Sequence, residues 1–164
     1  MELDPAFVAD CPYGPGALLI DRILEVDRSA NRVVARMPTS ADLPITRDQR
    51  ADPVRHPRHV SGGLMVHATG IMGFAHAYFV LDLRHAEGWT GYGTHIHHGR
   101  FRKMGTIGPP LALAATATSV RKIRGAYVIR YEFRFTQGDD VVYESEHTAL
   151  FTQVGAASAP PPAT

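Results

Sequence analysis

Apolar and charged residues alternate most regularly in the last third of the chain. Between residues 127 and 135 every second residue is apolar or aromatic, and three of the residues between them are charged. A period of two is typical of a β-strand with one buried face. The side predicted to be buried carries Tyr127, Ile129, Tyr131, Phe133 and Phe135, and the opposite side carries Arg130, Glu132 and Arg134.

Five other segments, rich in β-branched and apolar residues, are also predicted to be strands. Residues 23–27 and 32–37 flank a short polar turn, which predicts an antiparallel pair. Residues 92–103, 111–122 and 141–153 complete the set, and glycine-containing turns separate them from their neighbours.

A long uncharged segment lies between the first two predicted strands and the last four. Residues 62–81 contain no Asp, Glu, Lys or Arg, and Ser61 is a favourable N-cap just before them. The segment is long enough to span a bilayer. It also contains His67, Thr69, His76 and four glycines, which favour a buried central helix, so no membrane span is predicted.

The order of elements predicts how they pack. Two strands are followed by a proline-rich loop at residues 38–60, the apolar helix and four more strands. A helix and a sheet that each present an apolar face must cover one another. We therefore predict an α+β domain over residues 1–154, in which a curved antiparallel sheet wraps around one central helix. Residues 155–164, rich in Pro and Ala, are expected to be a disordered tail.

Composition narrows the class of protein. A chain of 164 residues is expected to form one domain. Its 17 Lys and Arg residues nearly balance 16 Asp and Glu residues, and 45% of the residues are hydrophobic, so neither overall disorder nor nucleic-acid binding is predicted. Cys11 is the single cysteine, and the N-terminus lacks a basic region followed by an apolar run. A cytoplasmic location is therefore expected.

Three motifs resemble those of a known superfamily. They are Tyr-Gly-Pro-Gly-Ala-Leu-Leu-Ile-Asp-Arg at residues 13–22, Ser-Gly-Gly-Leu-Met-Val at residues 61–66 and Gly-Arg-Phe-Arg-Lys at residues 99–103. In their order and content they resemble the hotdog superfamily, in particular the β-hydroxyacyl-acyl-carrier-protein dehydratases, over most of residues 12–152. The resemblance implies a single hotdog fold, whose sheet surrounds one long helix.

The catalytic pair of those dehydratases does not carry over to this chain. Their catalytic His lies nine residues before the helix-opening Gly, where this chain has Pro53, and their catalytic acid lies five residues after it, where this chain has His67. No Asp or Glu occurs anywhere in residues 53–81. A dehydration that uses a His and a carboxylate would need its acid from elsewhere.

A second hotdog group resembles the chain more closely before the helix. Thioesterase-like enzymes of macrolactam and isonitrile lipopeptide pathways carry a Gly-His-Phe-Asn-type element there, and this chain has Arg-His-Val-Ser at residues 58–61. Those enzymes add glycine to an α,β-unsaturated acyl thioester, and some also hydrolyse it. The resemblance implies that His59 is a catalytic base, and the alternative is a surface loop histidine. At the positive end of the predicted helix, the backbone N–H groups of Gly62 and Gly63 are suited to polarise the thioester carbonyl, and glycines that merely permit tight packing are an equally good interpretation.

The loop before the helix also carries candidate substrate-binding residues. Cations beside His59 are suited to hold the carboxylate of an amino-acid donor. The alternative is a solvated loop, whose surface charges need no special explanation. The candidate substrate-binding residues are Arg55, His56, Arg58 and Ser61.

A basic cluster at residues 100–103 is a candidate carrier contact. Arg100, Arg102 and Lys103 are suited to meet an acidic carrier protein or a phosphate group. Solvated strand ends are an equally good interpretation.

The remaining histidines do not predict a metal site. His67 and His76 are nine residues apart on the helix and face opposite ways, so they are expected to be core or interface histidines. On the predicted strand, His95 and His97 share a face and His98 points away, which leaves too few ligands on either face.

Together these observations predict an enzyme that acts on an acyl thioester, carried by an acyl carrier protein or CoA, without a cofactor. The favoured reaction is addition of glycine or a similar amine to an enoyl thioester, with or without hydrolysis. The alternatives are a divergent hydroxyacyl dehydratase, a plain thioesterase and a non-catalytic acyl-binding protein. A homodimer or a multiple of it is expected, because a single hotdog domain leaves a sheet edge unpaired.

Overall fold

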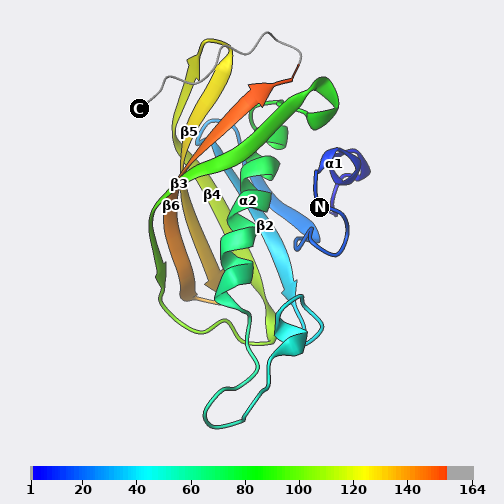
Figure 1. Cartoon of the computed structure of the whole chain (residues 1–164), viewed down its shortest axis with the longest axis vertical. Coiled ribbons are helices and arrows are strands. Elements are labelled where there is room, and N and C mark those ends of the chain that lie inside the picture. Colours follow the sequence, from blue (N-terminus) through cyan, green and yellow to red (C-terminus); the bar gives the residue numbers. More distant parts are fainter. Residues whose placement is uncertain (1, 155–164) are drawn as a thin grey trace.

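Six antiparallel strands form one curved sheet around a single long helix (Figure 1). The computed structural model describes residues 2–154, so the predicted tail at 155–164 lies outside the described residues. The strands lie in the order β1-β2-β4-β5-β6-β3. The elements are α1 (Pro5–Asp10), β1 (Arg22–Asp27), β2 (Arg32–Thr39), α2 (Gly62–Phe79), β3 (Trp89–Phe101), β4 (Gly108–Ile123), β5 (Ala126–Gln137) and β6 (Asp140–Gln153), with short 3-10 helices at Thr46–Asp48 and His85–Glu87.

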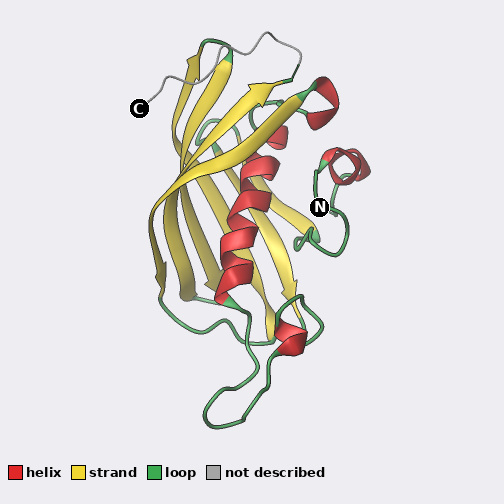
Figure 2. Ribbon diagram, in the orientation of Figure 1, coloured by secondary structure: helices red, strands yellow, loops and turns green. Residues whose placement is uncertain are grey.

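This architecture confirms the predicted α+β hotdog fold (Figure 2). All six strands and the central helix fall at the predicted places. α1 and the two 3-10 helices were not predicted, because each spans only three to six residues and carries no hydrophobic period of useful length. No helix in residues 2–154 is long and apolar enough to cross a membrane.

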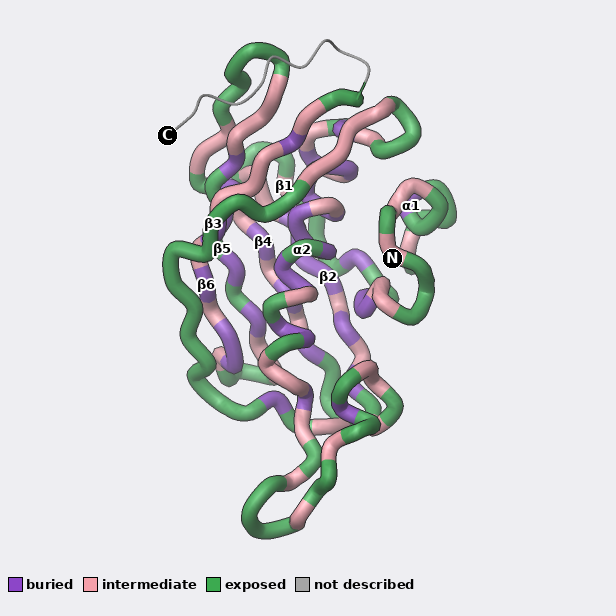
Figure 3. The backbone as a smooth tube through the Cα atoms, in the orientation of Figure 1, coloured by how far each residue is buried: buried purple, intermediate pink, exposed green. Residues whose placement is uncertain are grey.

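The core lies between α2 and the concave face of the sheet. On β5 the alternate residues Ile129, Tyr131, Phe133 and Phe135 are buried, as the period of two predicted. Figure 3 shows buried backbone along α2 and along the strands behind it. The N-terminal segment adds α1, whose Phe7 ring packs against the aromatic residues at the C-terminal end of α2.

Two edges of the sheet differ in how well they are protected. β1 has only six residues and is bridged by Glu2 through Arg22. β3 has thirteen residues, pairs only with β6, and is exposed throughout residues 92–101 (Figure 3). A long unpaired edge favours pairing with another chain.

Two β-bulges change which histidines of β3 share a face. The pairing with β6 shifts between Gly93 and His95 and again between Ile96 and His98. The His95 and His97 rings are stacked 5.9 Å apart, so they share a face as predicted. The prediction that His98 faces away is wrong. His97 contacts Thr148 and His98 contacts Glu146, two residues apart on β6 and therefore on one face, because the bulge inserts an extra residue.

The helix-facing side of β3 is formed largely by glycines. A Cβ atom on Gly91 would lie 2.3 Å from the buried ring of Phe151, whereas a Cβ atom on Gly93 would meet nothing within 4 Å. Gly91 therefore permits a close ring contact, and Gly93 leaves open space between β3 and α2.

Comparison of these two glycines tests this account. Gly91→Ala should destabilise the fold by about 1–3 kcal/mol because the buried Phe151 ring must move. Gly93→Ala should change the free energy of unfolding by less than about 0.5 kcal/mol, since its Cβ enters open space. Urea unfolding measures both, and equal destabilisation by the two variants would contradict the packing described.

One histidine is buried in the core and links α2 to β5. His76 has no exposed surface, and its Nδ1 lies 3.0 Å from the hydroxyl of Tyr131. Burial lowers the pKa of His76 to about 4, because the charged ring would lose its hydration. His76 is thus a core residue, as the sequence predicted.

This burial makes the stability dependent on pH. The unfolded chain protonates His76 below about pH 6.5, whereas the folded chain does so only near pH 4, so lowering the pH favours unfolding. The contribution between pH 7 and pH 5 is about 2 kcal/mol. Urea unfolding at pH 7 and pH 5 measures the difference in the free energy of unfolding between the two pH values. This difference should be smaller in His76→Gln, whose amide can still contact Tyr131, than in the wild type. An unchanged difference would show that His76 is not the group responsible.

Candidate functional site

The start of α2 presents an unpaired backbone donor. Ser61 caps the helix, and its Oγ accepts a hydrogen bond from the Gly63 N–H at 3.3 Å. The Gly62 N–H has no hydrogen-bond partner in residues 2–154. An unpaired N–H at the positive end of a helix is suited to bind an oxygen that carries negative charge.

The backbone of His59 is held from several directions. The Gln49 side chain accepts a hydrogen bond from the His59 N–H and donates one to the His59 carbonyl, both at 3.0 Å. The Thr46 hydroxyl donates to the same carbonyl, and His59 forms an isolated β-bridge with Thr106. These contacts fix the loop just before α2, below the end of the sheet in Figure 1.

The side chain of His59 has a defined tautomer. Its Nδ1 lies 2.8 Å from the Pro57 carbonyl oxygen, which can only accept, so Nδ1 carries the hydrogen. In the neutral ring Nε2 then carries the lone pair. The half-buried His59 ring therefore presents a proton acceptor, and the His56 ring packs edge-on against it at 5.0 Å.

A phenyl ring covers the first residue of the helix. A Cβ atom on Gly62 would lie 2.9 Å from Phe101, so the glycine is needed for this approach. Gly63 has no such contact, since its nearest neighbours would be 3.6 Å or more from a Cβ atom. The two predicted glycines thus lie in different environments, and Phe101 forms one wall beside the Gly62 N–H.

The cations of the loop are already engaged with the chain. Arg55 forms an ion pair with Asp52 at 3.0 Å and is largely exposed. Arg58 donates a hydrogen bond to the Gln49 carbonyl at 3.2 Å. Because a carboxylate already neutralises Arg55, Arg58 and His56 are the better placed partners for an external anion.

The basic cluster at the end of β3 is likewise paired in part. Arg102 forms an ion pair with Glu144, and the Lys103 ammonium lies 2.5 Å from Asp140. Arg100 is exposed, and its side chain makes no hydrogen bond or ion pair within residues 2–154. Within this predicted carrier-contact group, Arg100 therefore has the least engaged side chain, although, after the Arg102 hydrogen bond, its charge also helps to lower the pKa of Glu144.

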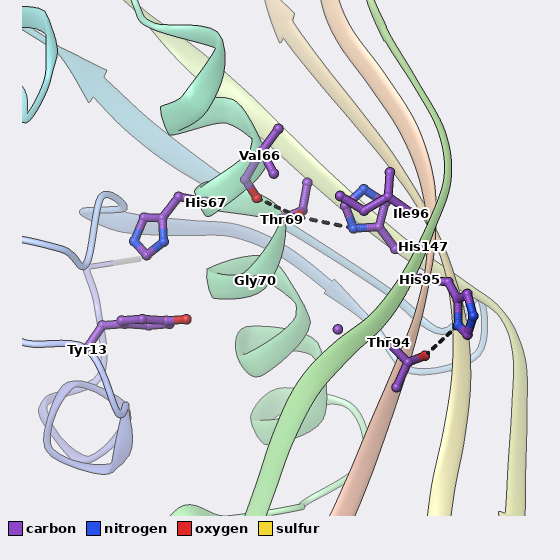
Figure 4. Close-up of a pocket in the computed structure, with 10 residues that line it drawn as sticks. Tyr13, Val66, His67, Thr69, Gly70, Thr94, His95, Ile96 and His147 are labelled. Carbon is purple, nitrogen blue, oxygen red and sulfur yellow. Dashed lines mark hydrogen bonds between the residues drawn. The ribbon is translucent and has the colours of Figure 1, made fainter. Parts of the chain in front are cut away.

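A cavity of about 290 Å³ lies between α2 and β3 (Figure 4). His67 lines it, packs against the Tyr13 ring at 4.8 Å and makes a 2.9 Å hydrogen bond with the Ala17 carbonyl. The lining residues include imidazoles, hydroxyls and apolar groups but no Asp, Glu, Lys or Arg, and they are Tyr13, Val66, His67, Thr69, Gly70, Gly93, Thr94, His95, Ile96 and His147.

Sequence reasoning missed the polar contact that closes one wall of this cavity. Thr69 and His147, 78 residues apart, face each other with 3.4 Å between Thr69 Oγ1 and His147 Nδ1. The signal available in the sequence was polar residues, Ser145 and His147, at alternate positions on the inward face of the last strand. In residues 2–154 no group of three His, Cys, Asp or Glu residues is arranged to hold a metal ion.

Comparison with solved structures identifies the fold. A mutant of the thioesterase PA1618 from Pseudomonas aeruginosa matches with a TM-score of 0.62 and 15% identity, covering 90% of this chain and 92% of that one. The thioesterase HI1161 from Haemophilus influenzae matches with a TM-score of 0.60 and 18% identity, covering 93% and 92%. The dehydratase heterocomplex ApeI:P from Xenorhabdus doucetiae matches with a TM-score of 0.62 and 16% identity, covering 94% and 93%.

These similarities concern backbone geometry and not sequence. No family model and no curated protein matches the chain. At such low identity a shared architecture carries many different functions. The comparisons therefore establish that the chain folds as a single hotdog domain, of the kind found in these thioesterases and in this dehydratase complex.

Proposed function

We propose that this protein is an enzyme acting on an acyl thioester, with its reacting centre at the start of α2. The observation that carries the proposal is that a proton acceptor and an unpaired N–H donor lie within four residues of each other in the sequence. The Pro57 carbonyl engages Nδ1 of His59, which leaves Nε2 as the acceptor of the neutral ring, and Gly62 presents an N–H without a partner in the described chain. A base and an oxyanion donor are the two groups that nucleophilic reactions of thioesters require.

The proposed reaction is conjugate addition of an amine to an α,β-unsaturated acyl thioester. The amine nitrogen bonds to the β-carbon, and the electrons of the double bond move toward the carbonyl oxygen at the Gly62 N–H. His59 Nε2 takes the proton released from the amine and returns it to the α-carbon. No cofactor is needed for this sequence of steps. Attack of water on the carbonyl, with the same base, would instead hydrolyse the thioester.

Glycine, or a similar amino acid, is the proposed donor. Its carboxylate would be held by Arg58 and His56, with Ser61 beside them, because these groups surround His59 in the loop. Arg55 contributes less, since Asp52 already pairs with it. The substrate would arrive on an acyl carrier protein or CoA, and Arg100 would attract its negative charge.

Thioester hydrolysis without an amine is the second candidate. The Arg55–Asp52 ion pair favours it, because it removes one cation from the proposed carboxylate site. Dehydration is less well supported, since His67 stands where the dehydratase pattern requires an acid and residues 53–81 contain no Asp or Glu. A non-catalytic acyl-binding role would leave the defined tautomer of His59 without a purpose.

Product analysis separates these reactions. With crotonyl-CoA and glycine, mass spectrometry should detect an N-carboxymethyl adduct, and methylamine should react poorly because it lacks a carboxylate. His59→Gln should lower turnover by about 10²- to 10⁴-fold, as expected for a lost general base. The matched control is His85→Gln, which replaces an exposed histidine far along the chain.

The outcomes bear on the proposal as follows. Free crotonic acid without adduct would move hydrolysis ahead of addition, and equal rates with glycine and methylamine would remove the carboxylate site. Arg58→Ala should raise the apparent KM for glycine and spare hydrolysis. Full activity in His59→Gln would show that the reacting centre lies elsewhere.

We also infer that the enzyme is a homodimer formed through the β3 edge. β3 exposes unpaired backbone groups and the apolar side chains of Tyr92 and Ile96, each 57% exposed. Antiparallel pairing of two β3 strands would bury these groups and place both cavities beside the interface.

Charge placed on each edge tests this assembly. In sedimentation experiments at micromolar concentration, Ile96→Lys should convert a dimer into a monomer, because the lysine would be buried across the twofold axis. Leu24→Lys is the matched control, since Leu24 is half-exposed on the opposite edge strand β1. A wild-type monomer of 17.9 kDa would rule out the dimer.

A further inference from the structure

Hydrogen bonds fix the orientation and tautomer of His147. The Thr69 hydroxyl donates to the Val66 carbonyl at 2.7 Å, so its oxygen is free to accept from His147 Nδ1, 3.4 Å away (Figure 4). Nδ1 therefore carries the hydrogen, and Nε2 carries the lone pair in the neutral ring. Thr69 thus plays for His147 the part that the Pro57 carbonyl plays for His59.

The acceptor on His147 is buried without a partner. His147 is 7% exposed, and its Nε2 makes no hydrogen bond to residues 2–154. The hydroxyl of Ser145, two residues earlier on the same face of β6, is also buried and unpartnered. Burial lowers the pKa of His147, and the nearby His97 and His98 lower it further, so the ring is neutral at neutral pH. Buried polar groups normally have partners, and the unpaired Nε2, which in the neutral ring can only accept, therefore points to a missing hydrogen-bond donor. Ser145 lies outside the lining of the cavity.

The cavity between α2 and β3 gives a ligand access to this wall. Gly70 and Gly93 contribute no side chains to it, and a Cβ atom on Gly93 would meet nothing within 4 Å. Ile96 lies opposite His147 in the strand pairing and lines the same cavity.

The lining of the cavity also defines the chemistry of its occupant. Because no carboxylate, lysine or arginine lines it, the occupant is uncharged where it meets the wall. The neutral acceptor on His147 requires a donor, and a hydroxyl is the smallest uncharged group that supplies one. From Gly62 to Thr69 the helix rises about 10 Å, so this donor lies several carbons beyond a thioester held at Gly62.

We propose that His147, positioned by Thr69, accepts a hydrogen bond from a hydroxyl carried on the distal part of the acyl chain, so that the enzyme selects hydroxylated acyl thioesters. This inference rests on the proposed acyl-thioester function. A purely alkyl chain would leave Nε2 unpaired, whereas a hydroxylated chain satisfies it, and this difference provides the selectivity.

Binding measurements with two matched ligands test the subsite without turnover. The ligands are analogues of octanoyl-CoA and 8-hydroxyoctanoyl-CoA in which an amide replaces the thioester. Calorimetry should show that the hydroxylated analogue binds about tenfold more tightly, the ratio expected for one net hydrogen bond. His147→Phe should abolish the preference, and His85→Phe, which alters an exposed histidine outside the cavity, should retain it.

The role of Thr69 has its own readout. Thr69→Val removes the hydroxyl with little change in shape, and histidine ¹⁵N NMR should then show His147 populating its other tautomer. Thr69→Ser should restore the original tautomer and the preference for the hydroxylated ligand. If Thr69 only fills space, Thr69→Val should leave both the His147 tautomer and the preference for the hydroxylated ligand unchanged.

Each failure is distinguishable from failure of the proposed function. Equal binding of the two analogues, or binding of neither, overturns the hydroxyl subsite. The thioester chemistry is judged separately, by the turnover of crotonyl-CoA and its dependence on His59. Gly93→Val should weaken the binding of both analogues, because the valine side chain enters the cavity. Unchanged affinity would place the acyl chain elsewhere.

Discussion

The structure depends on enclosing one helix that has almost no polar face. Eleven of the eighteen residues of α2 are buried, and none of the eighteen carries a permanent charge. Such a helix is stable in water only if other elements surround it. The strands therefore curve around it, and the proline-rich loop and the N-terminal segment close the remaining sides. The positions of His59, at the start of α2, and of the cavity, along its flank, both follow from this enclosure.

The enclosure is least complete at β3, and that is where the open space lies. Gly91 allows β3 to approach the buried Phe151 ring, but Gly93 leaves a gap next to Gly70 on the helix. Two bulges interrupt the pairing of the same strand with β6, and its other edge is unpaired because β3 is the last strand of the sheet. The strand that encloses the core most loosely thus borders the cavity and also has the exposed edge to which we assign the proposed dimer.

Three histidines show how surroundings decide the chemistry of one residue type. His76 is buried against Tyr131, and its low pKa keeps it neutral in the core. His59 is half-buried just before α2 and donates from Nδ1 to the Pro57 carbonyl, which leaves Nε2 as the acceptor of the neutral ring. His147 has the same tautomer, fixed by Thr69, but its Nε2 is buried beside a cavity. The proposed base and the proposed hydrogen-bond acceptor therefore use the same ring in different surroundings.

The sequence by itself determined the sheet, the central helix and the place of His59, because periods of two, an uncharged run and an N-cap are local signals. It also placed the cationic loop beside His59. Only the tertiary structure decided which side chains form ion pairs or hydrogen bonds with one another. The ion pair of Arg55 depends on how the loop turns, the faces of His97 and His98 depend on a bulge, and the contact of Thr69 with His147 joins residues 78 apart. Such contacts follow from strand register and from the depth at which the helix sits, and no local pattern specifies either.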